Sequence, residues 1–200
     1  MKRVLSFILA LTMTLTLCAC GSGSGKLSPY LMDFQFGAGE EATEKAILEL
    51  EKNDTFTVNG IEFSSVFADY SDGHMIGIRY SAGDTIILSA YDESYPNLVV
   101  PGSEAEPIVS DLIEKYNQAY AILVKSFGQP EKGNTAEQLL TPEDYEMNYV
   151  SKDVSARWHY DGHTITLKAD ATIATESVSG YEYISHVRYL APTLFLFIYV

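Results

Sequence analysis

The strongest structural signal in this chain lies at residues 106–127, which read EPIVSDLIEKYNQAYAILVKSF. Apolar side chains recur there at the spacing of one helical face, namely Ile108, Val109, Leu112, Ile113, Tyr116, Tyr120, Leu123, Val124 and Phe127. Ser103 and Glu106 have the spacing of a capping box at the start, and Gly128 and Pro130 end the run. An apolar stripe of this width predicts a long helix that lies across a sheet.

Short β-rich runs precede this helix, and residues 40–52 predict a shorter helix before them. Strands are expected at residues 55–59, 61–71, 74–81 and 85–91. The turn pairs between them are Asn59-Gly60 and Asp72-Gly73, which supply the positive φ angles of tight hairpins, and then Ala82-Gly83-Asp84. These runs predict an antiparallel meander.

A second set of strands follows the long helix, at residues 154–160, 163–169 and 181–190. Thr141-Pro142 indicates another helix start ahead of them. The chain ends in an apolar tail at residues 193–200, which is too short to cross a bilayer and too apolar to lie free in water. We expect a buried or paired terminal strand there, and an edge strand that faces a partner is the alternative.

The order of helix, meander, helix and meander predicts an α+β fold. The motif DGHMIGIR at residues 72–79 matches DGHTITLK at residues 161–168, which indicates a duplication unless two Asp-Gly hairpins coincide by chance. We therefore expect two helix-plus-antiparallel-meander units, with the helices packed on one face of the antiparallel sheet. They make one domain at residues 30–200, or two tandem units at 30–100 and 101–200.

The first residues have the parts of a secretion signal, because Lys2 and Arg3 precede an apolar run at residues 4–17. Leu17-Cys18-Ala19-Cys20 then resembles the lipobox of bacterial lipoproteins. The resemblance implies a signal peptide at residues 1–19, a lipid-modified Cys20, and an anchor on the extracytoplasmic face of the cell membrane. Residues 20–29 would form a flexible Gly/Ser tether. An ordinary signal peptide is the alternative, but cleavage leaves one unpaired cysteine, which favours lipidation.

The charge of the chain limits its partners. Removal of Lys2 and Arg3 with the signal leaves 11 of the 13 basic residues against 27 acidic ones, so the formal charge falls from −14 to −16. Nucleic acid and anionic lipid surfaces are unfavourable partners for such a chain. We therefore expect membrane contact through the lipid alone, no nucleic acid, and a preference for cationic ligands.

Two histidines and an aspartate within residues 158–163, WHYDGH, suggest a metal site. If Asp161-Gly162 is a two-residue turn, Tyr160 pairs with His163 and the neighbour His159 pairs with Thr164. The two histidines then point to opposite faces of the sheet. Because zinc needs three or four convergent ligands, we expect a structural hairpin and no metal.

No pattern of residues indicates catalysis. Gly-x-Ser-x-Gly, the phosphate-binding glycine patterns, Cys-x-x-Cys and His-Glu-x-x-His do not occur. The acidic groups lie at expected helix starts, where carboxylates stabilise the dipole: Glu40, Glu41, Glu44, Glu143, Asp144 and Glu146. We expect solvated faces there, and a catalytic dyad or a calcium site is the alternative. We therefore expect no enzyme, no cofactor and no catalytic residues.

The arrangement of the exported part also resembles small bacterial lipoproteins of the SmpA/OmlA type and the β-lactamase-inhibitory-protein-like fold. The resemblance rests on Phe36-Gly37 before an acidic helix, a meander, a long helix that ends in Phe127-Gly128-Gln129-Pro130, and a strand with Trp158. The chain departs from the pattern at Ala38 and in its apolar tail. The resemblance implies a helix-on-sheet module built for protein contacts.

The sequence thus predicts a surface-anchored, non-enzymatic module that binds an unknown protein or envelope component. A lipoprotein that binds a small peptide, sugar or cation is the alternative, for which tyrosines exposed on strands would form a platform. An envelope hydrolase that uses scattered carboxylates is a third hypothesis.

Overall fold

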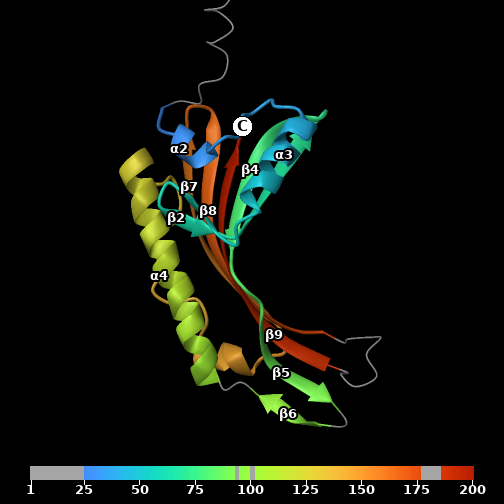
Figure 1. Cartoon of the computed structure of the whole chain (residues 1–200). Coiled ribbons are helices and arrows are strands. Elements are labelled where there is room, and N and C mark those ends of the chain that lie inside the picture. The colour runs from blue at the N-terminus through green and yellow to red at the C-terminus, as the bar shows by residue number, and fades with distance from the viewer. Residues whose placement is uncertain (1–24, 93–94, 100–101, 177–185) are drawn as a thin grey trace, which may run out of the picture.

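The computed structural model describes residues 25–92, 95–99, 102–176 and 186–200 (Figure 1). Helices accompany a mostly antiparallel sheet, so the predicted α+β class is confirmed. The predicted signal peptide and Cys20 lie outside the described residues. Within them, no helix combines the length and the apolar character that crossing a membrane requires.

The helical elements are α2 (Ser28–Leu31), α3 (Glu40–Leu50), α4 (Gly102–Phe127) and the 3-10 helix η1 (Pro142–Glu146). α4 begins earlier than expected, so Ser103 lies inside the helix and its predicted role as the N-cap is wrong. The predicted helix start at Thr141 is confirmed, since Thr141 and Asp144 form a capping box. Leu27 is fully buried ahead of α2, so the folded part includes residues that were expected in the tether.

The strands in the described part of the chain are β1 (Phe56–Val58), β2 (Ile61–Phe63), β3 (Ser65–Ser71), β4 (His74–Ala82), β5 (Ile86–Asp92), β6 (Tyr95–Val99), β7 (Val150–Tyr160), β8 (His163–Glu176) and β9 (His186–Tyr199). β1 and β2 form a two-stranded sheet, and the other seven form one large sheet. β9 lies at its centre, with β8 and then β7 on one side, and β4 and β5 on the other. The expected second strand, at residues 61–71, is therefore two strands in different sheets.

β4 and β5 do not form a hairpin, so the meander expected around Ala82-Gly83-Asp84 is wrong. The two strands follow one another along β9, where β4 pairs with residues 194–199 and β5 with residues 186–190. Pro192 lies opposite the gap, and a Cβ atom on Gly83 would lie 2.0 Å from its carbonyl oxygen. The backbone nitrogen and the carbonyl oxygen of one strand residue point to the same side, so the nitrogen of Pro192 faces the gap. This nitrogen carries no hydrogen and cannot donate a hydrogen bond to a neighbouring strand.

The predicted register of the hairpin at Asp161-Gly162 is confirmed. Tyr160 pairs with His163, and Trp158 pairs with Ile165 along β7 and β8. Asp161 has a φ of 52° and Gly162 a φ of 80°, as a two-residue turn of this kind needs. The hairpins at residues 59–60 and 72–73 have the same positive φ angles.

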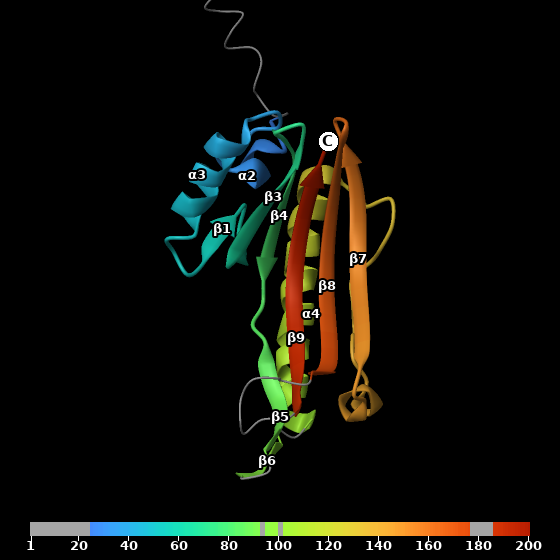
Figure 2. The ribbon, with the colours of Figure 1, turned by 90° about the vertical axis from the view of Figure 1, so that its right-hand side faces the viewer.

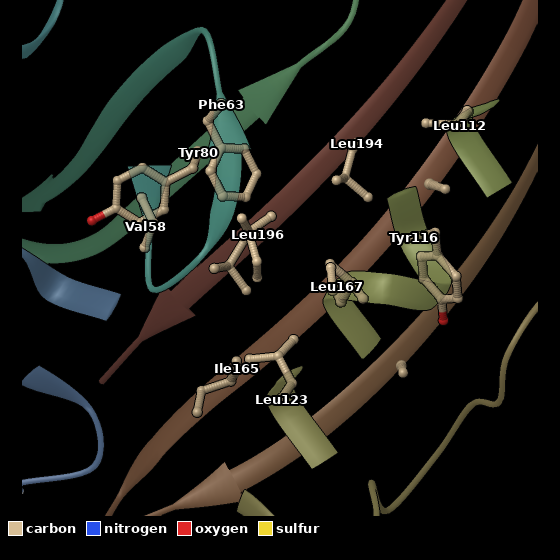
Figure 3. Packing of buried hydrophobic residues seen from close by; sticks show 14 of the residues in the cluster. Val58, Phe63, Tyr80, Leu112, Tyr116, Leu123, Ile165, Leu167, Leu194 and Leu196 are labelled. Carbon is tan, nitrogen blue, oxygen red and sulfur yellow. The ribbon is translucent and has the colours of Figure 1, made fainter. Parts of the chain in front are cut away.

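The apolar tail is a central strand rather than an edge, which confirms the expected paired strand and rules out the edge alternative. One set of its side chains, Leu194, Leu196 and Ile198, is buried. Figure 3 shows leucines of β9 and β8 directed toward α4 and toward the β1–β2 hairpin. α4 contributes a buried row at helical spacing that consists of Ala105, Val109, Leu112, Tyr116, Ala119 and Leu123. Burial of each large apolar side chain stabilises the fold by roughly 1.5–3 kcal/mol.

Candidate binding surface

The side of the large sheet that faces away from α4 is the candidate functional surface, and we name it the open face. Figure 2 shows β4, β9, β8 and β7 side by side in front of α4, with no described helix over their near side. Its central members are Phe67 on β3, Arg79 on β4, and Phe195, Phe197 and Tyr199 on β9. These side chains alternate with the buried leucines because successive residues of a strand point to opposite faces.

Three aromatic rings stack along β9 on this face. The ring centroids of Phe195 and Phe197 lie 5.5 Å apart, and those of Phe197 and Tyr199 lie 6.4 Å apart. All three residues are half-buried, whereas 46% of Phe67 is exposed. A row of aromatic side chains with this exposure is typical of surfaces that contact another molecule.

Arg79 lies between two of these rings, because it pairs with Phe67 on one side and with Phe197 on the other. Its guanidinium carbon lies 4.8 Å from the centroid of the Phe67 ring, which is a cation–π contact. Its Nε atom is buried and has no hydrogen-bond partner in the described part of the chain. A buried donor without a partner costs about 1–3 kcal/mol.

Tyr199 is the last of the three aromatic residues along β9. Its ring lies over Gly77, where a Cβ atom would lie 2.2 Å from the ring carbon Cδ1, and its hydroxyl donates a hydrogen bond of 2.6 Å to Asp69. Burial, together with the hydrogen bond to Asp69 and the charge of that carboxylate, raises the pKa of Tyr199 to about 12. The phenol therefore stays protonated at neutral pH and remains a donor to Asp69.

The flank of the open face on β8 and β7 is polar. Lys168 lies beside Phe195 and forms an ion pair of 3.1 Å with Asp170. Thr164, Thr166 and Thr172 share this side of β8. The open face thus combines an aromatic stripe, a hydroxyl-rich border, and two arginines, Arg79 and Arg157, that form no ion pair with any described residue.

The histidines near the hairpin do not converge. His159 Nδ1 lies 2.8 Å from a carboxylate oxygen of Glu131, and His163 Nδ1 lies 2.8 Å from the backbone oxygen of Asp161. The ring of His163 also contacts that of Phe36, with centroids 4.9 Å apart. Among the residues that the structure describes, no three His, Cys, Asp or Glu side chains lie together as a metal site.

The predicted acidic groups differ in their exposure and in their hydrogen bonds. Glu40 and Glu41 are exposed in the first turn of α3, and Glu44 accepts a hydrogen bond from Tyr70. Asp144, by contrast, is buried, so the expectation of a solvated group at this helix start is wrong for it. Its carboxylate accepts hydrogen bonds from the Lys152 ammonium and the Thr141 amide, which lower its pKa.

Sequence reasoning did not identify the open face. The signal was present at residues 194–199, where Leu, Leu and Ile alternate with Phe, Phe and Tyr. Aliphatic residues at one parity and aromatic residues at the other indicate two different environments for the two faces. Arg79 and Phe67 give no such local signal, because strand pairing alone brings them to Phe197.

No family model, curated protein or solved structure matches this chain.

Proposed function

We propose that this chain is a non-enzymatic lipoprotein that binds another protein through the open face. The observation that carries the proposal is the stack of Phe195, Phe197 and Tyr199 beside Arg79, on a side of the sheet that no described helix covers. Aromatic residues and arginine are the residue types most enriched where proteins bind one another, and they supply most of the binding energy there.

The chemistry of the partner follows from Arg79. A partner carboxylate that reaches its guanidinium would gain a charge-assisted hydrogen bond while apolar partner groups cover Phe67 and Phe197. Exclusion of water would strengthen both the cation–π contact and the new hydrogen bond. We therefore expect the partner to present an acidic residue beside apolar ones.

The proposal includes the anchor. We propose that Cys20 is the lipid-modified N-terminus and that the chain works outside the cytoplasmic membrane, since the pattern at residues 17–20 resembles a lipobox. Two acyl chains on one cysteine are enough for stable membrane attachment without a spanning helix. Mass spectrometry of the membrane fraction should find a diacyl modification that Cys20→Ala removes, and a soluble, unmodified mature chain would contradict it.

We also propose the architecture of the SmpA/OmlA-type lipoproteins for the exported part. The indole nitrogen of Trp158 donates a hydrogen bond of 2.9 Å to the backbone oxygen of Gly128, directly after α4. This bond joins two of the features on which the resemblance rests, the end of the long helix and the tryptophan strand. It supports a helix-on-sheet module in which α4 is held against β7.

Site-specific photocrosslinking tests the binding proposal. A chain that carries p-benzoylphenylalanine at position 67 should crosslink a defined protein in intact cells. The same probe at position 48 is the matched control, because Leu48 is a 64% exposed apolar residue on α3. The product at position 67 should weaken when Arg79→Gln is added. Equal products at both positions, or none at position 67, would refute binding through the open face, and turnover by the purified chain would contradict the non-enzymatic role.

A further inference from the structure

A groove of about 530 Å³ opens where the sheet is interrupted between β4 and β5, away from the open face. A smaller hollow of about 230 Å³ shares four lining residues with it, namely Glu62, Ala82, Lys115 and Leu194. The β1–β2 hairpin forms one wall and the first half of α4 forms the other. Its size is that of a site for a small organic molecule.

The groove exists because of the gap opposite Pro192. β2 pairs with β1 in a separate sheet, and β4 ends at Ala82, so the large sheet has no continuous strand there beside β9. The side chains that remain at the base are apolar: Phe63, Ala82, Leu112, Pro192 and Leu194. Phe63, Leu112 and Leu194 are buried members of the core, so the base of the groove is held by the packing of the domain.

The rim of the groove is acidic. It carries Asp54, Glu62, Asp84 and Asp111 against a single cation, Lys115. Lys115 forms an ion pair of 2.8 Å with Asp111, which leaves three carboxylates without an ion pair to any residue in the described ranges. The groove therefore has an excess of negative charge beside an apolar base.

We infer that this groove binds a small organic cation, with an ammonium or guanidinium group on an apolar body. The apolar body would displace water from the base near Leu194, and the cation would lie at the rim beside Glu62 and Asp84. An anionic ligand would meet the three free carboxylates, and a neutral ligand would gain only the apolar contact. This activity is separate from the protein contact proposed for the open face.

A pair of matched probes tests the inference on the whole mature chain, which carries Cys20→Ser so that no lipid is attached. 2-Phenylethylammonium should cause saturable amide shifts at Ala82 and Leu194 in ¹H–¹⁵N NMR spectra. Its neutral analogue 2-phenylethanol should bind at least tenfold more weakly. Equal affinity of the two probes, or no saturable binding of the cation at millimolar concentration, would overturn the inference.

A charge variant and its control separate the groove from general attraction to an acidic protein. Glu62→Gln should raise the dissociation constant of the cation about fivefold, as expected for one charge near contact distance at the surface. Glu49→Gln removes the same charge on α3, where Glu49 forms an exposed ion pair with Lys52, and should leave the constant unchanged. Equal weakening by both variants would overturn the site. Because neither variant touches the open face, crosslinking at position 67 reports on the proposed protein contact independently.

Discussion

Gly77→Ala tests whether the position of the Tyr199 ring on the open face depends on the absence of a side chain at residue 77. The Tyr199 ring lies across Gly77, and an added Cβ atom would lie 2.2 Å from two of its carbon atoms. Real carbon atoms do not approach so closely, so the ring must swing away from β4. Its hydroxyl then loses the 2.6 Å hydrogen bond to Asp69.

The cost of this change follows from three contributions. The hydrogen bond to a carboxylate contributes about 1.5 kcal/mol, at the lower end of the range because the face is partly exposed. Lost packing of the ring contributes about 1 kcal/mol, as for other shape changes of this size. Alanine is more favourable than glycine inside a strand by about 0.5–1 kcal/mol, which offsets part of the loss. We expect Gly77→Ala to lower the free energy of unfolding by about 2 kcal/mol, as measured by urea denaturation.

The pKa of Tyr199 gives a second measurement of the same change. In the folded chain this pKa is about 12, above the ordinary tyrosine pKa of 10.0. The stability that protonated Tyr199 contributes through this hydrogen bond is therefore fully present below pH 10 and is lost as the pH rises through 12. NMR titration of ¹³C-labelled tyrosine should show the pKa falling toward 10 in Gly77→Ala. In a Tyr199→Phe background, Gly77→Ala should cost at most about 0.5 kcal/mol, since no hydrogen bond remains to be lost and the preference for alanine offsets most of the lost packing. A stability within 0.5 kcal/mol of the wild type, with the pKa still near 12, would refute the reasoning.

Two further predictions concern the parts that hold the sheet. The pKa of Asp144 is lowered chiefly by its hydrogen bond from Lys152. The contribution of this carboxylate to the free energy of unfolding is therefore present above the pKa of an unfolded aspartate and is lost as the pH falls through the pKa of the folded chain. Asp144→Asn should lower the free energy of unfolding in urea denaturation by about 1–3 kcal/mol at pH 7 and by far less near pH 2. Glu143→Gln, at an exposed residue, should change this free energy little. A loss of stability in Asp144→Asn that does not depend on pH would contradict the charge argument. Gly83→Ala should lower the free energy of unfolding by about 1–3 kcal/mol, because its Cβ atom would lie 2.0 Å from the backbone oxygen of Pro192. An unchanged midpoint of thermal unfolding would show that the gap between the strands can relax.

Local patterns predicted the parts of the fold that local chemistry specifies. Asp161-Gly162 determines its own turn, because both residues tolerate positive φ angles, and the turn then sets the pairing of Trp158 with Ile165. The apolar row of α4 likewise predicts a helix with one buried side. The same register places His159 and His163 on opposite faces of the sheet, since neighbouring positions of a strand pair point to alternate faces.

The candidate surfaces could not be predicted in this way. The open face needs Phe67, Arg79 and Phe197 in one row; Phe67 and Arg79 meet in a local hairpin, but Arg79 and Phe197 pair across more than a hundred residues of chain. The groove needs a strand that stops at Ala82 opposite Pro192, and nothing near either residue indicates that they meet. Both features arise from the pairing of β9 with strands from both halves of the chain.

Contacts between near neighbours in the chain were enough to predict the α+β class, the Asn-Gly and Asp-Gly turns, helices α3 and α4, and the alternation of residues 194–199. Long-range pairing decided that this last segment lies at the centre of the sheet, that its aromatic side chains lie on the face opposite α4, and that a groove opens beside it. Pairing between distant strands is selected by the burial of the whole core, and no single stretch of the chain contains that information.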